Sequence, residues 1–392
     1  MAEPAPLSYE GVAAVAPVSV PYERYSSKSA HWWLLKALRG LTEAARIRPD
    51  QIDGLAVSSF SLHPDTAVGF AQHAGLELRW LEQIPSGGAS GPMALTRAAR
   101  AVQAGDAGIV ACIAGDTNHI HSFRRMTAGF SRFSLDAAYP YGAGGPNAYF
   151  ALLTAHYMRR FGATREDFGH IAVCQRQNAL SYPFALMKSP LSLEQYLGAR
   201  AIAEPLALFD CVMPCSGGEG FLVMREDVAD GLDLGGARIL AAIERHNAFA
   251  DDPIQFRGGW ARDRESFWHR AGVSPEDIDF LQTYDDYPVI SMMQIEDLGF
   301  CRKGEAAEFV RCRDLTNSGQ FPHNTTGGQL STGQAGAAGG YLGLVDAIRQ
   351  LTGASLGRQV PEARTAVVSG FGIVNFDRGV CASAVALSGC GG

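Results

Sequence analysis

The pattern of hydrophobic and polar positions recurs in the two halves of the chain. In the first half, a glycine-rich turn at 86–91 precedes a helical pattern over 92–105 and an apolar strand over 108–116. The same order of turn, helix and apolar strand returns over 327–372. Strands that are apolar almost without interruption are typical of central strands covered by helices on both faces. The repeat predicts an α/β fold built from two similar halves.

A shorter motif supports the duplication. Residues 47–55 read IRPDQIDGL, and residues 273–281 read VSPEDIDFL. Both contain Pro-acid-x-Ile-Asp, a pattern that resembles a helix start leading into a strand. A strand is predicted after each motif, over 56–60 and over 282–287.

The chain is expected to divide into three segments. Residues 1–116 would form the first part of the N-terminal half, and 226–392 the C-terminal half. Residues 117–225 would carry a loop insertion and then return to the N-terminal half. A helix is predicted over 148–162, and the polar and aromatic stretch 246–268 is expected to be a surface loop.

Composition excludes several classes of function. The 392 residues are 47% hydrophobic and 19% charged, with a net charge of −7. This mildly acidic balance argues against nucleic acid or an anionic membrane as the main partner. No apolar run is long enough for a membrane span, and no signal peptide is recognised. The eight cysteines lack metal-site spacing, which predicts no metal and free thiols in a reducing cytoplasm.

Three long segments resemble the bacterial sterol-carrier-protein-x-type thiolases. They begin HIAVCQRQNALSYPF (170–224), YDDYPVISMMQIEDLGF (284–310) and FPHNTTGGQLSTGQAG (321–353). The resemblance implies the thiolase fold, in which two βαβαβαββ halves form a five-layered αβαβα core with a loop insertion that contacts coenzyme A. It also implies a homodimer.

The residues that do thiolase chemistry are replaced in this chain. A thiolase uses a cysteine at a helix N-terminus, where the thiol pKa is lowered. The resemblance puts Gly88 at that position, so no acyl-enzyme can form there. Gln334 stands where the activating histidine would be, and an amide is no base near neutral pH. Ser369 stands in place of the second cysteine.

A tyrosine at position 284 resembles the thiolase-like aldolases of steroid side-chain degradation. These are coenzyme A ester retro-aldolases that lack the thiolase cysteines and work with an OB-fold partner of the DUF35 type. Retro-aldol cleavage needs a base and an acid but no covalent acyl carrier. The second tyrosine of those aldolases aligns with Ala338 here, with Tyr341 three residues on, and this departure weakens a two-tyrosine mechanism.

The proton-transfer groups are predicted among a few polar residues. Asp285 and Asp286 are adjacent, so in a strand only one of them would face the pocket. His323 precedes Asn324, in a stretch that resembles the family's loop beside the active centre, and the unperturbed pKa of histidine suits acid–base work. Ser90 is expected to cap the helix that follows it. The predicted catalytic residues are Tyr284, Asp285, Asp286, His323 and Gln334. The predicted substrate and oxyanion positions are Gly88, Ser90, Asn324, Gly328, Ser369 and Gly372.

Several functions remain open from the sequence. The first is an enzyme that acts on a coenzyme A thioester by aldol chemistry, with no covalently bound cofactor. A cysteine-independent acyltransferase and a non-catalytic thiolase-like subunit, either working with a DUF35-type partner, are the alternatives. A true thiolase that uses a displaced thiol, Cys112 or Cys381, is a third, although Cys112 lies in an apolar strand that suits a nucleophile poorly.

Overall fold

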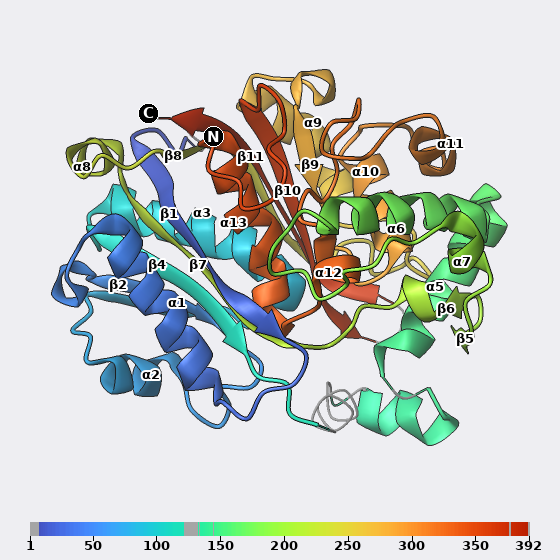
Figure 1. Cartoon of the computed structure of the whole chain (residues 1–392), viewed down its shortest axis with the longest axis horizontal. Helices are drawn as coiled ribbons and strands as arrows, with labels where there is room; N and C mark the ends of the chain where they lie inside the picture. The colour runs from blue at the N-terminus through green and yellow to red at the C-terminus, as the bar shows by residue number, and fades with distance from the viewer. Residues whose placement is uncertain (1–7, 121–131, 133, 144, 376–377, 391–392) are drawn as a thin grey trace.

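The structure is a computed structural model that describes residues 8–120, 132, 134–143, 145–375 and 378–390 (Figure 1). Nine strands are joined in the order β3-β2-β4-β7-β1-β8-β11-β10-β9. Strands β1 and β8 pair over a short stretch, Ala13 to Val15 against Gly236 to Arg238. The strands therefore form a first-half sheet and a second-half sheet that meet at a narrow seam.

The two sheets repeat one arrangement of strands. In the first, β2 is parallel to β4, and β7 is antiparallel to both β4 and β1. In the second, β9 is parallel to β10, and β11 is antiparallel to both β10 and β8. An additional strand, β3, pairs in parallel with β2 and forms the edge of the first sheet. The first-half strands are β1 (Val12–Glu23), β2 (Gly54–Ser58), β3 (Trp80–Gln83), β4 (Ile109–Asp116) and β7 (Ser216–Arg225), and the second-half strands are β8 (Gly236–His246), β9 (Phe280–Gln282), β10 (Thr365–Asn375) and β11 (Arg378–Cys390).

Helices cover both sheets and fill the space between them. The central helices α3 (Ser90–Ala104) and α13 (Gly339–Leu351) share one hydrophobic core with strands of both halves. Helices α1 (Ala30–Ala45) and α2 (Ala67–Ala74) pack on the outer face of the first sheet. Helices α9 (Trp260–Ala271) and α10 (Pro288–Asp297) pack on the outer face of the second. The result is a stack of five layers, helix and sheet in alternation, as Figure 1 shows.

Most of the remaining elements surround the second half, whereas α8 packs on β1 and β7 of the first half. The remaining elements are α5 (Pro146–Phe161), α6 (Arg165–Ala179), α7 (Leu193–Leu197), α8 (Glu226–Gly231), α11 (Ala306–Arg311), α12 (Gly328–Thr332) and the small sheet of β5 (Ala201–Ala203) with β6 (Leu206–Ala207). Helices α5 and α6 contribute to the same core as α9 and α10.

The predicted α/β fold with two similar halves is confirmed. The helix predicted over 92–105 is α3, and the strand predicted over 108–116 is β4. Both Pro-acid-x-Ile-Asp motifs form a single 3₁₀ turn before a strand, at Pro49–Gln51 and Pro275–Asp277.

Two local predictions are wrong. The stretch 246–268 is not a surface loop throughout, because α9 begins at Trp260, whose buried indole donates to the carbonyl of Ser383 at 2.8 Å. The strand predicted over 282–287 ends at Gln282, and Pro288 then opens α10. Proline favours the first turn of a helix, where its missing N–H costs nothing.

Among the described residues, none of the helices combines the length and the apolar character needed to cross a lipid bilayer.

Candidate active site

The turn before α3 meets the connection between β9 and α10 at Gly88. Gly88 lies in the 3₁₀ turn Gly87–Ala89, and a β-carbon built on it would overlap the ring of Tyr284 and the carbonyl oxygen of Phe371. The Tyr284 ring therefore fills the space where a nucleophilic side chain would begin. Only glycine leaves room for this ring.

Tyr284 and Asp286 form a hydrogen-bonded pair in the β9–α10 connection. The Tyr284 hydroxyl donates to Asp286 Oδ2 at 2.9 Å. Asp286 Oδ1 is buried and has no hydrogen-bond partner among the residues that the structure describes. Buried carboxylate oxygens are normally paired. A substrate hydroxyl is the kind of donor that would satisfy this oxygen.

Burial shifts the acidity of both groups in the pair. It raises the pKa of Asp286 to about 7, opposed by the hydrogen bond from Tyr284 and reinforced by the nearby charge of Asp285. Burial, followed by the charge of Asp286, raises the pKa of the Tyr284 phenol well above its ordinary value. At neutral pH Tyr284 is therefore a proton donor, while Asp286 is poised between acid and base.

Gln334 contacts the same phenol from the second glycine-rich turn. Its Nε2 donates to the Tyr284 hydroxyl at 3.4 Å and to the carbonyl of Gly336 at 3.2 Å. Its Oε1 accepts from the backbone N–H of Gly336 at 3.1 Å. The amide thus faces Tyr284 with a donor, so the phenolic proton is left to point toward Asp286.

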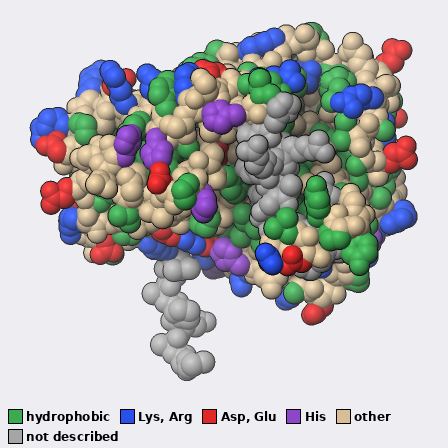
Figure 2. Space-filling view, turned by 90° about the horizontal axis from the view of Figure 1, so that it is seen from below, with side chains coloured by type: hydrophobic (Ala, Val, Ile, Leu, Met, Phe, Trp, Pro, Cys, Tyr) green, Lys and Arg blue, Asp and Glu red, His purple; other side chains and the backbone are tan. Residues whose placement is uncertain are grey.

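These polar groups line a cavity of about 290 Å³. It lies where strands β9 and β10 of the second half end. Figure 2 shows the molecule from below, with histidine and hydrophobic side chains spread over that face. Most of the cavity walls are apolar, so a charge inside is poorly screened. The lining residues are Phe60, Gly87, Gly88, Gly145, Pro146, Asn147, Tyr149, Phe150, Cys211, Val212, Pro214, Tyr284, Asp286, Tyr287, Gln334, Phe371, Gly372, Ile373 and Val374.

Part of the cavity wall comes from the start of α5. Tyr287 stacks on Phe150 with ring centroids 4.0 Å apart and planes 23° apart. The Tyr287 hydroxyl donates to Asn147 Oδ1 at 2.5 Å. The hydroxyl of Tyr287 is thus already engaged, whereas its ring forms part of the cavity surface.

Asp285 lies behind the cavity. Its carboxylate accepts from the backbone N–H groups of Gln329 at 2.9 Å and Leu330 at 3.2 Å, at the start of α12. A β-carbon on Gly328 would overlap this carboxylate, so a glycine is needed there. Asn324 braces the same connection, because its Oδ1 accepts from the backbone N–H of Thr283 at 2.8 Å. These three predicted residues support the connection and do not line the 290 Å³ cavity.

His323 is also outside the cavity. It is completely buried, and its Nε2 lies 2.8 Å from Thr283 Oγ1. Burial lowers its pKa to about 3, so the ring is neutral at physiological pH. The ring therefore contacts the hydroxyl of Thr283, the residue before Tyr284, and not Asp286.

Ser369 takes part in holding Tyr284 in place. Its hydroxyl donates to Gln294 Oε1 at 2.7 Å. Gln294 in turn accepts from the backbone N–H of Tyr284 at 3.2 Å and donates to its carbonyl at 2.7 Å. The sequence analysis did not identify Gln294, because its position within the apolar helix α10 gave no sign of a contact with Tyr284.

Two further predicted positions lie at the start of α3 and in β10. The Ser90 hydroxyl donates to the carbonyl of Ile84 at 3.2 Å. Ser90 is the first residue of α3 and not its N-cap, so the expected capping role is wrong. Gly372 lines the cavity, and a β-carbon on it would overlap the carbonyl of Ser86.

Thiols in this region are protonated. Burial raises the pKa of Cys112 and of Cys381, the two candidates for a displaced nucleophile. Cys211, which the sequence did not suggest as a nucleophile, lines the cavity, and burial raises its pKa to about 12. A thiol with such a pKa is a poor nucleophile near pH 7. Among the described residues, no group of three or more His, Cys, Asp or Glu is arranged to hold a metal ion.

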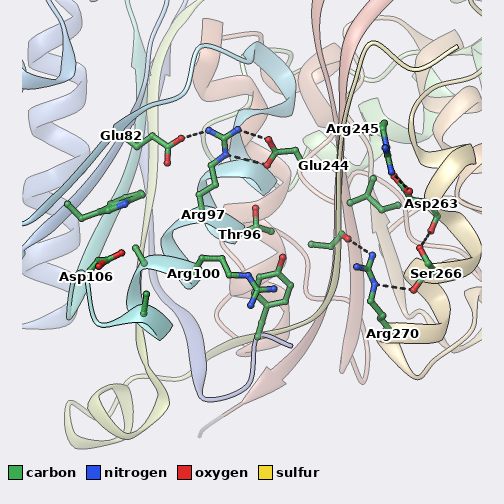
Figure 3. A pocket seen from close by; sticks show the side chains of 16 residues that line it. Glu82, Thr96, Arg97, Arg100, Asp106, Glu244, Arg245, Asp263, Ser266 and Arg270 are labelled. Atoms are coloured by element: carbon green, nitrogen blue, oxygen red, sulfur yellow. Dashed lines mark hydrogen bonds and ion pairs between the residues drawn. The ribbon is translucent and has the colours of Figure 1, made fainter. Parts of the chain in front are cut away.

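A second cavity, of about 590 Å³, lies between α3, β8 and α9 (Figure 3). Its arginines point at carboxylates and carbonyls. Arg97 bridges Glu82 and Glu244, and Arg245 binds Asp263 at 2.5 Å. Because these charges are already engaged, this cavity offers less chemistry than the one at Tyr284.

Comparisons with known proteins agree with this geometry. Residues 245–381 match the model of the thiolase C-terminal domain-like family. A steroid side-chain-cleaving aldolase of Thermomonospora curvata is 28% identical, with 93% of this chain and 96% of that protein covered. The 17-hydroxy-3-oxo-4-pregnene-20-carboxyl-CoA lyase of Mycobacterium tuberculosis is also 28% identical, covering 93% and 97%. The solved Ltp2-ChsH2(DUF35) aldolase superposes with a TM-score of 0.82 at 27% identity, covering 96% and 97%.

The fold and these matches define the class of protein that the chain resembles: it is similar to proteins of the thiolase superfamily. Its glycine at position 88 sets it apart from thiolases that use a cysteine. Its relatives lie in the branch of thiolase-like aldolases.

Proposed function

We propose that this protein makes or breaks a carbon–carbon bond in a coenzyme A thioester by aldol chemistry that requires no cysteine. The observation that carries the proposal is the hydrogen-bonded pair of Tyr284 and Asp286, which lines a largely apolar cavity and leaves Asp286 Oδ1 without a partner among the described residues. The aldolase and the carboxyl-CoA lyase named above support the same chemistry.

In the cleavage direction, the pair would move one proton. Asp286 Oδ1 accepts the proton of the β-hydroxyl group, and the carbon–oxygen bond becomes a carbonyl as the bond between the α- and β-carbons breaks. The electron pair passes to the thioester and forms an enolate. Tyr284 protonates the α-carbon, and the proton on Asp286 then restores the phenol. The products are an aldehyde or ketone and a shortened acyl thioester, so the atoms balance without a cofactor.

The enolate oxygen needs hydrogen-bond donors. The backbone N–H groups of Gly87–Gly91 lie at the start of the central helix α3, where the helix dipole favours negative charge. Gln334 Nε2 is a second donor beside the phenol. Donors held in place at an apolar site stabilise developing charge more than water does.

Partners are proposed as finer features of the same function. A DUF35-type OB-fold partner is supported by the aldolase complex with that partner named above. A homodimer is supported by β3, an edge strand that leaves backbone groups for another chain to pair with. A reducing cytoplasm is supported by the eight cysteines, all of which are free thiols.

The proposal is tested with purified protein, alone and with a DUF35-type partner, and a series of β-hydroxyacyl-CoA esters. We expect release of an aldehyde or ketone together with the shortened acyl-CoA, and we expect iodoacetamide to leave the rate unchanged. Acyl transfer from a β-ketoacyl-CoA to free coenzyme A, blocked by iodoacetamide, would contradict it. If neither reaction occurs, with or without a partner, the result favours the alternative that the chain is a non-catalytic thiolase-like subunit.

The pH dependence of cleavage should report on Asp286. The reaction needs Asp286 in its carboxylate form, so kcat/KM should be low below pH 7 and should rise as the pH passes through about 7. Tyr284→Phe removes the hydrogen bond that lowers the pKa of Asp286. In the pH profile of any residual activity, the rise of kcat/KM should therefore move to higher pH. Tyr157→Phe is the matched control, since Tyr157 is a buried tyrosine paired with Glu296 away from the cavity. If the rise of kcat/KM occurs at the same pH in Tyr284→Phe as in the wild type, Asp286 is excluded as the titrating base.

A further inference from the structure

A buried carboxylate at the end of β4 joins the two halves of the molecule beside the candidate site. Asp116 is only 3% exposed. Its Oδ1 accepts from the hydroxyl of Ser59 at 2.9 Å and from the backbone N–H and hydroxyl of Ser61 at 2.6 and 2.5 Å. The backbone N–H of Phe60 donates to it as well, at 2.9 Å. All these donors lie in the loop that follows β2.

The other oxygen of the same carboxylate holds the second glycine-rich turn. Asp116 Oδ2 accepts from the backbone N–H of Ala337 at 2.7 Å. Gly336 has a φ of 59°, and a β-carbon on it would overlap Asp116. The turn is thus shaped to let the carboxylate approach, and a side chain at position 336 would separate the two.

Both segments that Asp116 holds end at the cavity. Phe60 lines the cavity, and its ring lies 3.2 Å from the place of a β-carbon on Gly87. The turn carries Gln334, whose side-chain amide makes two hydrogen bonds to the backbone of Gly336. Holding Gly336 therefore determines which end of the Gln334 amide faces Tyr284.

We propose that Asp116 is a positioning residue of the aldol site: it orients the amide of Gln334 through the 336–337 turn, so that Nε2 faces the Tyr284 hydroxyl and the phenolic proton points to Asp286. This inference rests on the proposed function. Without Asp116 the turn can shift, and the Gln334 amide loses the partners that distinguish its oxygen from its nitrogen. The Tyr284 hydroxyl would then be misaligned with Asp286, although Tyr284 does not contact Asp116.

The test is a double-mutant cycle in the full chain. Asp116→Asn and Gln334→Ala should each lower kcat roughly 10- to 100-fold with little change in KM, because small misplacements of reacting groups have effects of this size. If Asp116 acts through Gln334, the double variant should be no slower than Gln334→Ala alone. Multiplicative losses would overturn the proposal, as would an unchanged kcat in a folded Asp116→Asn.

Two controls separate positioning from stability. Asp53→Asn removes a carboxylate that accepts from the backbone N–H groups of Gly108 and Ile109 at the other end of β4, so it should lower the melting temperature and leave kcat unchanged. If Asp116→Asn does not fold, Gly336→Ala moves the turn away from an intact Asp116 and should reproduce the loss of kcat. A Gly336→Ala protein with normal kcat would count against the proposal.

A structural readout keeps this inference distinct from the proposed function. A crystal structure of Asp116→Asn should show the Gln334 amide turned away from Tyr284. If the wild type cleaves no β-hydroxyacyl-CoA ester but the amide turns as expected, the proposed function fails and the positioning role stands. If the amide keeps its place, the positioning role fails even when the wild type is an active aldolase.

Discussion

Asp286→Asn should lower kcat for cleavage of a β-hydroxyacyl-CoA ester about 10²- to 10⁴-fold, the range for loss of a general base. Asparagine has nearly the same shape as aspartate but cannot accept the proton of the β-hydroxyl group. Asp286 Oδ1 is buried and has no hydrogen-bond partner among the described residues. No neighbouring side chain is therefore in place to act as the base when Asp286 is replaced. KM should change much less, since the cavity walls stay in place.

The effect of this substitution on stability should be small or favourable. Burial raises the pKa of Asp286 to about 7, so the folded protein holds this proton more tightly than the unfolded chain does. The folded state therefore loses stability as pH rises from the ordinary aspartate range through about 7, and asparagine removes that loss. Urea unfolding at pH 7.5 should show a midpoint equal to or above that of the wild type.

A matched control comes from another buried tyrosine–carboxylate pair. Glu296 accepts a hydrogen bond from Tyr157 and pairs with Lys303 at 3.0 Å, away from the cavity. Glu296→Gln should cost stability, because it breaks a buried ion pair, and should leave kcat of the folded protein unchanged. Asp286→Asn with normal kcat would exclude the proton route through this carboxylate.

Gly88→Ala should both destabilise the protein and abolish its activity. The new methyl group overlaps the Tyr284 ring and the carbonyl of Phe371, and the carbonyl belongs to the rigid strand β10. Overpacking a buried site costs about 1–3 kcal/mol. Relief of the clash has to come from the Tyr284 ring, which would move away from Asp286, so kcat should fall at least 10²-fold by the same reasoning on misplaced groups.

Gly88→Cys carries the same clash, so the cysteine of thiolases should not bring thiolase activity to this chain. Gly88→Ala combined with Tyr284→Ala should recover part of the lost stability but no activity. Gly69→Ala is the control, since it lies in α2 with nothing within 4 Å of its added methyl group, and alanine favours a helix over glycine by about 1 kcal/mol. A Gly88→Ala protein as stable as the wild type would show that the Tyr284 ring does not require a glycine at position 88.

Most of the fold could be predicted from the chain. The apolar strands and the amphipathic helix patterns are local signals, and the pattern over 92–105 located the central helix α3 to within two residues. The prediction failed where tertiary packing decides. Trp260 looked like part of a polar surface loop, yet its indole is buried and α9 starts there. The strand near Tyr284 looked longer than it is, because Pro288 ends the extended pattern by opening a helix.

The candidate site was only partly predictable. The sequence pointed to Tyr284, Gln334 and Gly88 as neighbours through the resemblance to thiolases. The choice between Asp285 and Asp286 stayed open, and His323 was chosen from its residue type and from its place in a loop that resembles the family's loop beside the active centre. In the structure Asp285 accepts from backbone N–H groups of α12, and His323 is buried against Thr283. Asp116 was not identified, since its contacts join segments far apart in the chain. Gln294 was not identified, since it lies in an apolar helix that gave no sign of a contact with Tyr284.

The sequence by itself determined the α/β class, the duplication and the absence of a cysteine at position 88, because these follow from residue identity and local periodicity. Only the tertiary structure decided which carboxylate faces the cavity, that the Tyr284 ring fills the space above Gly88, and which groups hold that ring in place. The physical reason is that the pKa of a side chain, and the groups it can contact, depend on burial and on partners that folding brings together. The spacing of residues along the chain encodes neither the burial nor these partners.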